Sequence, residues 1–262
     1  MEAVPHIPVG ALSGMEGWGA TIAWSFVPEK VTWRLLAPDG EIRFLKVCCL
    51  GQQVSLAGER DRIVWAAPHL PVPQVLDYGA DSEHEWLLTS GLPGVDATEH
   101  PLRADPARLV PLLADGLRRF HALSIDSCPF DSRAAAMVRI AQGRVKRGLI
   151  DAQRDFHVEH GALSVEAALA QLMHLVPEQE DLVVCHGDYC LPNAMINDGR
   201  VSGHVDLGEL GVADRWWDLA IATWSVTWNL GPGWEDLFLE SYGVERDPNK
   251  VAFHRLLYDL VS

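Results

Sequence analysis

The sequence has few cysteines and no long apolar run. Its five cysteines, in a chain of 262 residues, show no C-x-x-C spacing, and the adjacent Cys48 and Cys49 would point to opposite faces of a strand. This pattern argues against structural disulfides and against a zinc ribbon. The apolar stretches fall well short of the ~20 residues that cross a bilayer, so we expect no transmembrane helix and no membrane partner.

Basic residues are also scarce compared with acidic ones. The chain has 21 Lys and Arg against 36 Asp and Glu, a formal net charge of −15. Such a charge repels phosphate backbones and attracts cations, so nucleic-acid binding is not expected. Residues 181–262 alone hold 13 acids and 5 bases. Composition leaves two explanations open, general solubility or a cation-binding cleft.

Nothing at the N-terminus is typical of a secretory signal. The first residues, MEAVPH, lack a basic start and an apolar stretch, so we expect a cytoplasmic protein. The 48% hydrophobic and 22% charged residues are typical of a folded protein. The length leaves room for two compact lobes.

The apolar pattern changes from strands to helices along the chain. An antiparallel meander of strands is predicted over residues 21–27, 31–37 and 41–47, followed by a helix over 55–67 and strands near 75–78 and 85–89. Helices are predicted over residues 106–123, 165–176, 214–229, 233–242 and 249–261. The expected domains are a strand-rich N-terminal lobe (1–89), a hinge (90–94) and a helical C-terminal lobe (95–262).

Polar residues gather in a predicted loop within the helical part. The segment HGDYCLPN places the carboxylate of Asp188 five residues before the carboxamide of Asn193, and Asp206 follows a short predicted strand. An Asn and an Asp suit Mg²⁺, which leaves Asp188 as a base. Lys46, in a predicted strand, is placed to contact nucleotide phosphates. Phosphoryl transfer needs this set: a base, metal ligands and a phosphate lysine.

Each of these residues has an ordinary structural interpretation when it is taken alone. A lysine in a strand commonly lies at an edge, and Asp-x-x-Gly is commonly a turn. In the order Lys, Glu, hinge, H-G-D-x-x-x-x-N and D-x-G, they follow the protein-kinase motifs, with HGD in place of HRD and DLG in place of DFG. The predicted fold class is therefore α+β, a two-lobed protein-kinase-like fold with an antiparallel-sheet N-lobe and a helix-rich C-lobe.

The same segments resemble the aminoglycoside phosphotransferase family of antibiotic-resistance kinases. The resemblance is densest in EDLVVCHGD (180–188), CLPN (190–193), GVADR (211–215) and DLA (218–220), and it covers nearly the whole chain beyond about residue 30. It is greatest to the enzymes that act on the 3′-hydroxyl of kanamycin-type compounds or the 3″-hydroxyl of streptomycin. It implies a kinase that uses Mg²⁺ and ATP or GTP to phosphorylate a small-molecule antibiotic and thereby confers resistance.

The resemblance implies a role for each matched residue of the catalytic machinery. Asp188 would be the catalytic base, with Asn193 and Asp206 as the magnesium ligands. Lys46 would be the phosphate lysine, held by Glu59.

The resemblance also implies a nucleotide-binding N-terminal lobe and a C-terminal lobe with the catalytic loop and the acceptor site. Backbone groups of Ser90 and Leu92 would contact the purine, and Asp218 would brace the catalytic loop. The loop near residues 27–30, VPEK, has no glycine or serine to cover the phosphates, so it would either hold the nucleotide loosely or rely on Lys30. The choice between ATP and GTP stays open.

The acceptor side departs from the family pattern. Relatives hold ammonium groups with carboxylates from a mid-chain insert and from the C-terminus, whereas this chain keeps Glu159 in the insert and Asp259 near the end. Tyr189 and several tryptophans add aromatic side chains. Helical spacing indicates that most of the tryptophans are core, while a minority, Trp228 among them, would line a flatter pocket.

Three functions are compatible with the sequence. An aminoglycoside acceptor fits the motifs and the acidic last third of the chain. A kinase for another antibiotic, such as a capuramycin-type nucleoside, fits the presence of only one acid, Glu159, in the insert and the extra aromatic side chains. A non-catalytic kinase-like binding protein would be expected to lose some of the catalytic set, and all of the set is present.

Overall fold

A computed structural model describes residues 6–26, 30–50 and 56–261. Contacts divide the chain into two units, Met1–Gly94 with Ser202–Gly208, and Val95–Val201 with Glu209–Ser262. Of the expected nucleotide loop at 27–30, only Lys30 is among the described residues.

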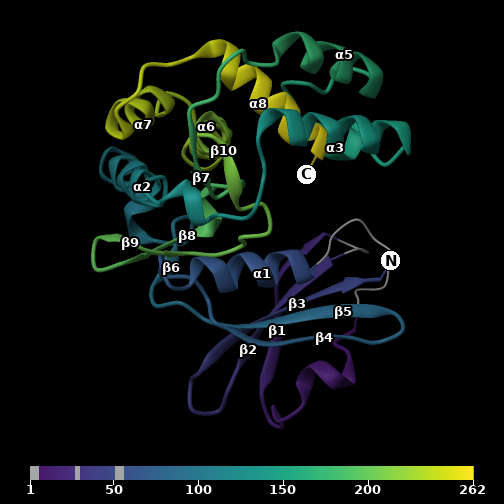
Figure 1. Cartoon of the computed structure of the whole chain (residues 1–262). Coiled ribbons are helices and arrows are strands. Elements are labelled where there is room, and N and C mark those ends of the chain that lie inside the picture. Colours follow the sequence, from purple (N-terminus) through teal and green to yellow (C-terminus); the bar gives the residue numbers. More distant parts are fainter. Residues whose placement is uncertain (1–5, 27–29, 51–55, 262) are drawn as a thin grey trace. The chain divides into compact units, whose positions relative to one another are not determined.

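In its described residues, the first unit contains a five-stranded antiparallel sheet and one α-helix (Figure 1). The strands are β1 (Gly19–Phe26), β2 (Lys30–Leu36), β3 (Ile42–Cys49), β4 (Val75–Ala80) and β5 (His84–Ser90), in the order β1-β2-β3-β5-β4. A short 3₁₀ helix, η1 (Val9–Leu12), precedes them, and α1 (Leu56–Ala66) follows β3. The antiparallel sheet predicted for the N-lobe is confirmed.

The two faces of this sheet have different partners because strand residues alternate. Leu45 and Val47 of β3 join Leu35 and Trp86 in a buried cluster that also contains Ala11 of η1. Lys46 lies between Leu45 and Val47 in sequence and therefore points to the other face of the sheet. The strand register pairs it with Thr32 of β2 and Leu87 of β5. Helix α1 reaches this second face, because its Glu59 contacts Lys46.

The second unit is mostly helical. Its helices are α2 (Pro106–Phe120), α3 (Ala134–Lys146), α4 (Ala152–Asp155), α5 (Val165–Leu175), α6 (Trp216–Leu230), α7 (Glu235–Tyr242) and α8 (Pro248–Val261), with short 3₁₀ turns η2 (Pro101–Ala104), η3 (Ile125–Ser127) and η4 (Leu191–Asn193). Strand β7 (Leu182–Cys185) pairs with β10 (Gly211–Asp214), and β6 (Val95–Asp96), β8 (Ala194–Asn197) and β9 (Arg200–His204) form a three-stranded sheet. Strand β9 begins in this unit, and its residues from Ser202 onward are grouped with the first unit. Among the described residues, none of the helices has the length and apolar character needed to cross a membrane.

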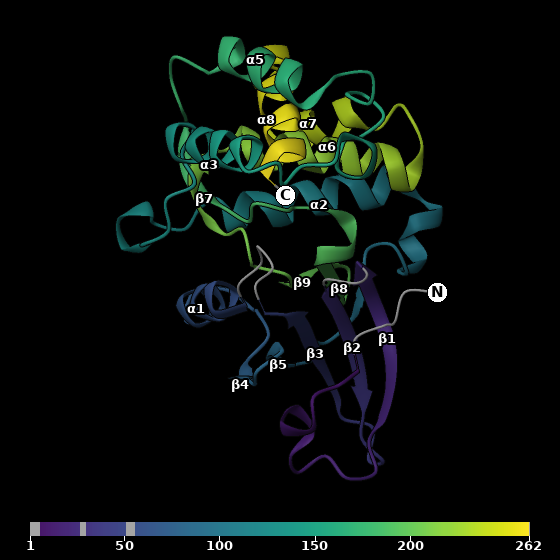
Figure 2. The same ribbon diagram turned by 90° about the vertical axis from the view of Figure 1, so that its right-hand side faces the viewer.

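Helix α8 packs against α3, α5 and α6 within this unit (Figure 2). Its buried Phe253, Leu256 and Leu260 share one core cluster with Trp217 of α6. Most residues of α6 are buried, so this helix passes through the interior of the unit.

Residues 202–208 depart from the expected domain boundaries. They were expected in the C-terminal lobe, but contact clustering groups them with the first unit. The His204 N–H donates to the carbonyl of Pro71 at 3.1 Å, and a Cβ at Gly203 would lie 2.8 Å from the same carbonyl oxygen. This close approach places Asp206 in the unit that contains Lys46.

Candidate active site

Three charged side chains meet in the first unit. Lys46 Nζ lies 2.5 Å from Glu59 Oε1 and 2.7 Å from Asp206 Oδ1. The exposed fractions of the side chains are 14% for Lys46, 5% for Glu59 and 38% for Asp206. Strand β3, helix α1 and the segment after β9 each supply one of the three. The structure thus brings together Lys46 and Glu59, as expected, and adds Asp206 as a second carboxylate on the lysine.

The two carboxylates control the charge of Lys46. Burial alone would lower the pKa of Lys46, but the attraction of Asp206 and Glu59 outweighs it, and the net effect is a raised pKa. Lys46 therefore stays an ammonium. Asp206, the more exposed carboxylate, has a φ of 59°, a left-handed conformation that Asp tolerates better than most residues.

A second group of polar side chains lies in the second unit, around Asp188. Asn193 Nδ2 donates to the Asp188 backbone carbonyl and to its Oδ2, both at 3.0 Å. Tyr258 of α8 donates its hydroxyl to Asp188 Oδ1 at 3.2 Å. Burial raises the pKa of Tyr258, as does the nearby charge of Asp188, so this hydroxyl keeps its proton and acts as a donor. The Asp188 carboxylate is therefore held at both oxygens.

The backbone before Asp188 is fixed by a buried carboxylate. Asp218 of α6 accepts from the N–H groups of His186 at 2.7 Å and Gly187 at 2.8 Å, and His121 Nε2 lies 2.9 Å from it. Burial alone would raise the pKa of Asp218, but the hydrogen bond from His121 and the other donors lower it overall. The carboxylate of Asp218 thus stays ionised and holds the loop, as expected.

Gly187 is required by this backbone geometry. Its φ is +90°, and a Cβ there would lie 2.4 Å from the Glu209 carbonyl oxygen. Trp217 Nε1 donates to the Gly187 carbonyl at 2.5 Å. A side chain at this position would displace the loop that carries Asp188.

Asn193 and Asp206, one in each unit, both carry oxygen donors of the kind that suits a magnesium ion. Because Asn193 uses its Nδ2 to hold Asp188, its remaining amide atom is the oxygen, a hard ligand. Asp206 supplies a carboxylate that is more than one-third exposed. These are the oxygen donors that Mg²⁺ prefers in proteins.

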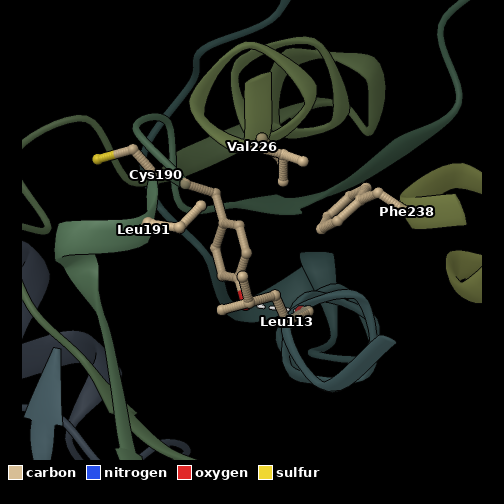
Figure 3. Close-up of a pocket in the computed structure, with 7 residues that line it drawn as sticks. Leu113, Cys190, Leu191, Val226 and Phe238 are labelled. Atoms are coloured by element: carbon tan, nitrogen blue, oxygen red, sulfur yellow. Dashed lines mark hydrogen bonds between the residues drawn. The ribbon is translucent and has the colours of Figure 1, made fainter. Parts of the chain in front are cut away.

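Tyr189 is not part of an acceptor surface, contrary to expectation. Only 2% of Tyr189 is exposed, and its hydroxyl donates to the Leu113 carbonyl at 2.8 Å. It lines a small apolar pocket, in which Val226 and Phe238 point toward the same space (Figure 3). Residues next to Asp188 alternate between the loop surface and the core, and Tyr189 is on the core side.

Asp259 is also not available as a surface carboxylate for an ammonium group. Its side chain has no exposed area and is bonded to His157 Nδ1 and, at 2.7 Å, to His160 Nδ1. The His157 backbone N–H donates to the same carboxylate at 3.1 Å. Burial alone would raise the pKa of Asp259, but the hydrogen bonds from His157 and His160 lower it overall. The structure therefore gives Asp259 an internal role.

Glu159 and Trp228, the other two residues expected to bind the acceptor, lie on the surface of the second unit. The Glu159 side chain is 46% exposed and accepts from Trp224 Nε1 at 2.8 Å and Arg255 Nη1 at 3.3 Å. Trp228 is 52% exposed, whereas Trp217 and Trp224 are buried, as helical spacing predicts for most of the tryptophans.

The residues expected to bind the nucleotide base and phosphates lie in the first unit. The Ser90 N–H donates to the Gln74 carbonyl at 2.9 Å, so this N–H is already used within the first unit. Leu92 follows β5, where its side chain lies against Gly203. The Lys30 ammonium lies 5.7 Å from the centre of the Trp24 ring.

No sequence pattern predicted the contact of Tyr258 with Asp188 or the hydrogen bonds that hold Asp218. His121 Nδ1 lies 2.7 Å from the Tyr242 hydroxyl, which extends the network from Asp218 to α7. These residues are far from the catalytic loop in sequence, and no local motif marks them. The one available signal for Tyr258 was its position next to Asp259, which was expected to bind the acceptor.

Comparisons with known proteins agree on one group of relatives. Residues 29–254 match the family described as "Phosphotransferase enzyme family". An aminoglycoside 3′-phosphotransferase of Streptomyces fradiae is 41% identical over 211 residues, 77% of this chain and 78% of that protein. A streptomycin 3″-kinase of Streptomyces griseus is 34% identical over 81% of this chain and 82% of its own length.

Solved structures give the same result. The crystal structure of a type VIII aminoglycoside 3′-phosphotransferase matches with a TM-score of 0.86 and 33% identity, over 96% of this chain and 98% of that chain. An aminoglycoside 3″-phosphotransferase of Streptomyces rimosus, solved in complex with ADP and streptomycin, matches with a TM-score of 0.77 and 30% identity, over 94% and 93% of the two chains.

Proposed function

Since the chain belongs to the aminoglycoside phosphotransferase family and is an antibiotic O-phosphotransferase of the resistance type, we propose that it transfers the γ-phosphoryl group of a nucleoside triphosphate to the 3′-hydroxyl of an aminoglycoside. The observation that carries the proposal is the Asp188 carboxylate, held by Asn193 and Tyr258 on a loop that Asp218 fixes.

The choice of the 3′-hydroxyl rests on the relatives. Both the 41% identical relative and the structure with the TM-score of 0.86 are aminoglycoside 3′-phosphotransferases. The 3″ enzymes match at 34% identity and a TM-score of 0.79 or less.

On the donor side, Lys46 would contact the phosphates. Glu59 and Asp206 hold the ammonium in place and keep it charged, so its position is set before the nucleotide binds. Asn193 and Asp206 would hold Mg²⁺, which when bound neutralises charge on the phosphates. The nucleotide-bound relative from Streptomyces rimosus supports a nucleoside triphosphate as the donor.

On the acceptor side, Asp188 would accept the hydroxyl proton as the oxygen attacks phosphorus. The Asn193 amide and the Tyr258 hydroxyl orient the carboxylate without neutralising it, because both are uncharged donors. Phosphoryl transfer depends mostly on positioning and charge, and one base at the acceptor oxygen completes the set.

The experiment compares three acceptors with ATP and with GTP, measuring nucleoside diphosphate release and product mass. The acceptors are a kanamycin-type compound, its 3′-deoxy analogue and streptomycin. We expect phosphorylation of the first compound alone. Turnover of the 3′-deoxy analogue or of streptomycin would contradict the 3′ assignment.

Replacing the base tests the role of Asp188. The Asp188→Asn variant keeps the shape of the side chain but cannot take a proton, so turnover should fall by roughly 10²–10⁴-fold. The melting temperature and nucleotide binding, measured by calorimetry, should stay close to wild type. A variant that keeps more than a tenth of wild-type turnover would remove Asp188 from this role.

A further inference from the structure

The rings around His157 form a surface with one large exposed face. The His157 ring stacks on Trp228 with 4.6 Å between centroids and 12° between planes, and Trp224 lies 5.2 Å from Trp228. Trp224 is buried, whereas Trp228 is 52% exposed. We call His157, Trp224 and Trp228 the aromatic cluster. A rigid, half-exposed tryptophan backed by other rings is suited to contact a ligand.

The aromatic cluster is connected to the catalytic base. The Tyr258 hydroxyl donates to Asp188, and the Tyr258 ring lies 5.8 Å from the His157 ring. Tyr258, which donates to Asp188, is thus linked to Trp228 through two ring contacts, Tyr258 with His157 and His157 with Trp228. If an acceptor of several rings presents one hydroxyl to Asp188, Trp228 lies near that acceptor.

The cluster already binds one cation from inside the protein. The Arg255 guanidinium lies 5.1 Å from the centre of the Trp224 ring, and it donates to Glu159. Glu159 thus shares its negative charge with an internal arginine, which weakens it as a ligand for an external ammonium. Tryptophan is the aromatic side chain that attracts cations most strongly, and Trp228 is the exposed tryptophan of the cluster.

We propose that Trp228, backed by His157, binds a protonated amine of the acceptor through a cation–π contact, and that Asp259 is a positioning residue that orients His157. The inference rests on the proposed aminoglycoside acceptor. Asp259 is buried and engaged by His157 and His160, so it influences the acceptor through the ring it holds.

The first test replaces Trp228. With a kanamycin-type acceptor, Trp228→Leu should raise the acceptor KM roughly tenfold, while Trp228→Phe should have a smaller effect because phenylalanine binds cations less strongly. The kcat and the nucleotide KM should stay unchanged. The matched control is Val158→Ala, at a fully exposed apolar residue next to His157, which should behave as wild type. An unchanged acceptor KM in Trp228→Leu overturns the inference, as does an equal rise in Val158→Ala.

The second test is a double-mutant cycle with Asp259→Asn. If Asp259 acts through the aromatic cluster, the Asp259→Asn substitution should raise the acceptor KM in the wild-type background. In the Trp228→Leu background the same substitution should change the acceptor KM less than about twofold. Equal effects in both backgrounds would contradict the positioning role. If Asp259→Asn does not fold, His157→Leu takes its place in the cycle, because the His157 side chain is 30% exposed.

These tests separate the inference from the proposed function. A wild-type protein that phosphorylates no aminoglycoside refutes the proposed function. A wild-type protein that does so, with Trp228→Leu unaffected, refutes the cation–π contact alone.

Discussion

Tyr258 is the residue whose removal should be visible in the pH dependence of the reaction. It donates a hydrogen bond to Asp188 Oδ1, which favours the ionised carboxylate. In Tyr258→Phe the carboxylate loses this donor and is easier to protonate, so the acid limb of the kcat profile should move to higher pH. The measurement is kcat from pH 5 to 9 at saturating substrates. Tyr242→Phe, in the same unit but bonded to His121, should leave that limb in place.

Asn193 should be identified by its effect on the magnesium requirement. Its amide holds Asp188 through the nitrogen, and its oxygen is the atom proposed for Mg²⁺. Asn193→Ala should raise the magnesium concentration for half-maximal turnover several-fold, since one oxygen ligand is lost. Titration with MgCl₂ at fixed nucleotide measures this. Asn197→Ala, on β8, is the control, and superimposable curves for Asn193→Ala and Asn197→Ala would reject the ligand assignment.

At the residue scale, sequence patterns predicted contacts between residues close together in the chain. They did not predict which side chains are buried by residues distant in sequence. The H-G-D-x-x-x-x-N segment indicated Asp188 and Asn193 as a pair, and they are hydrogen-bonded. Tyr189 and Asp259 were expected at the acceptor surface, but both are buried. Their surroundings come from α2 and from the segment around His157, which are distant in sequence, so no local pattern could report them.

At the element scale, helix α1 depends on a buried carboxylate from the sheet. Glu85 of β5 accepts from the N–H groups of Leu56 at 3.0 Å and Ala57 at 3.1 Å, and Tyr78 donates to it at 2.5 Å. A carboxylate at a helix N-terminus satisfies free N–H groups and complements the helix dipole. Glu59 lies in the first turn of the same helix. Glu85 therefore fixes the end of α1 that positions the partner of Lys46.

Glu85→Gln should consequently weaken nucleotide binding as well as stability. Loss of the charge at the helix end should cost about 1–2 kcal/mol, or a few degrees in Tm. The nucleotide KM should rise several-fold while the acceptor KM does not change. Calorimetry and initial rates measure the two effects, and Glu83→Gln, at an exposed neighbour, is the control. A lower Tm with an unchanged nucleotide KM would limit Glu85 to a structural role.

Elements were more predictable than their packing. The five strands and helix α1 lie within a few residues of the predicted ranges, because alternation and turn residues mark them. Helix α3 was missed although its buried Ala134, Met137, Val138 and Ala141 have helical spacing. The order β3-β5-β4 could not be read from the sequence, because pairing of strands depends on contacts between distant residues.

At the scale of the whole molecule, the net charge of −15 should act with opposite sign on the two substrates. A polycationic acceptor is attracted and a nucleotide is repelled, and salt screens both effects. From about 0.05 to 0.5 M NaCl, the acceptor KM should rise while the nucleotide KM falls or stays constant. Initial rates at each salt concentration test this. Parallel changes in the two constants would show that long-range charge does not select the acceptor.

The distance between Lys46 and Asp206 along the chain, 160 positions, has a consequence for biosynthesis. A ribosome adds ~5–20 residues per second, so Asp206 follows Lys46 out of the peptidyl-transferase centre after roughly 10–30 s. During that interval a nascent sheet would hold Lys46 and Glu59 without their third member. We therefore expect the growing polypeptide to complete the cluster of Lys46, Glu59 and Asp206 only after residue 206 has been translated, later than the pairing of the first strands.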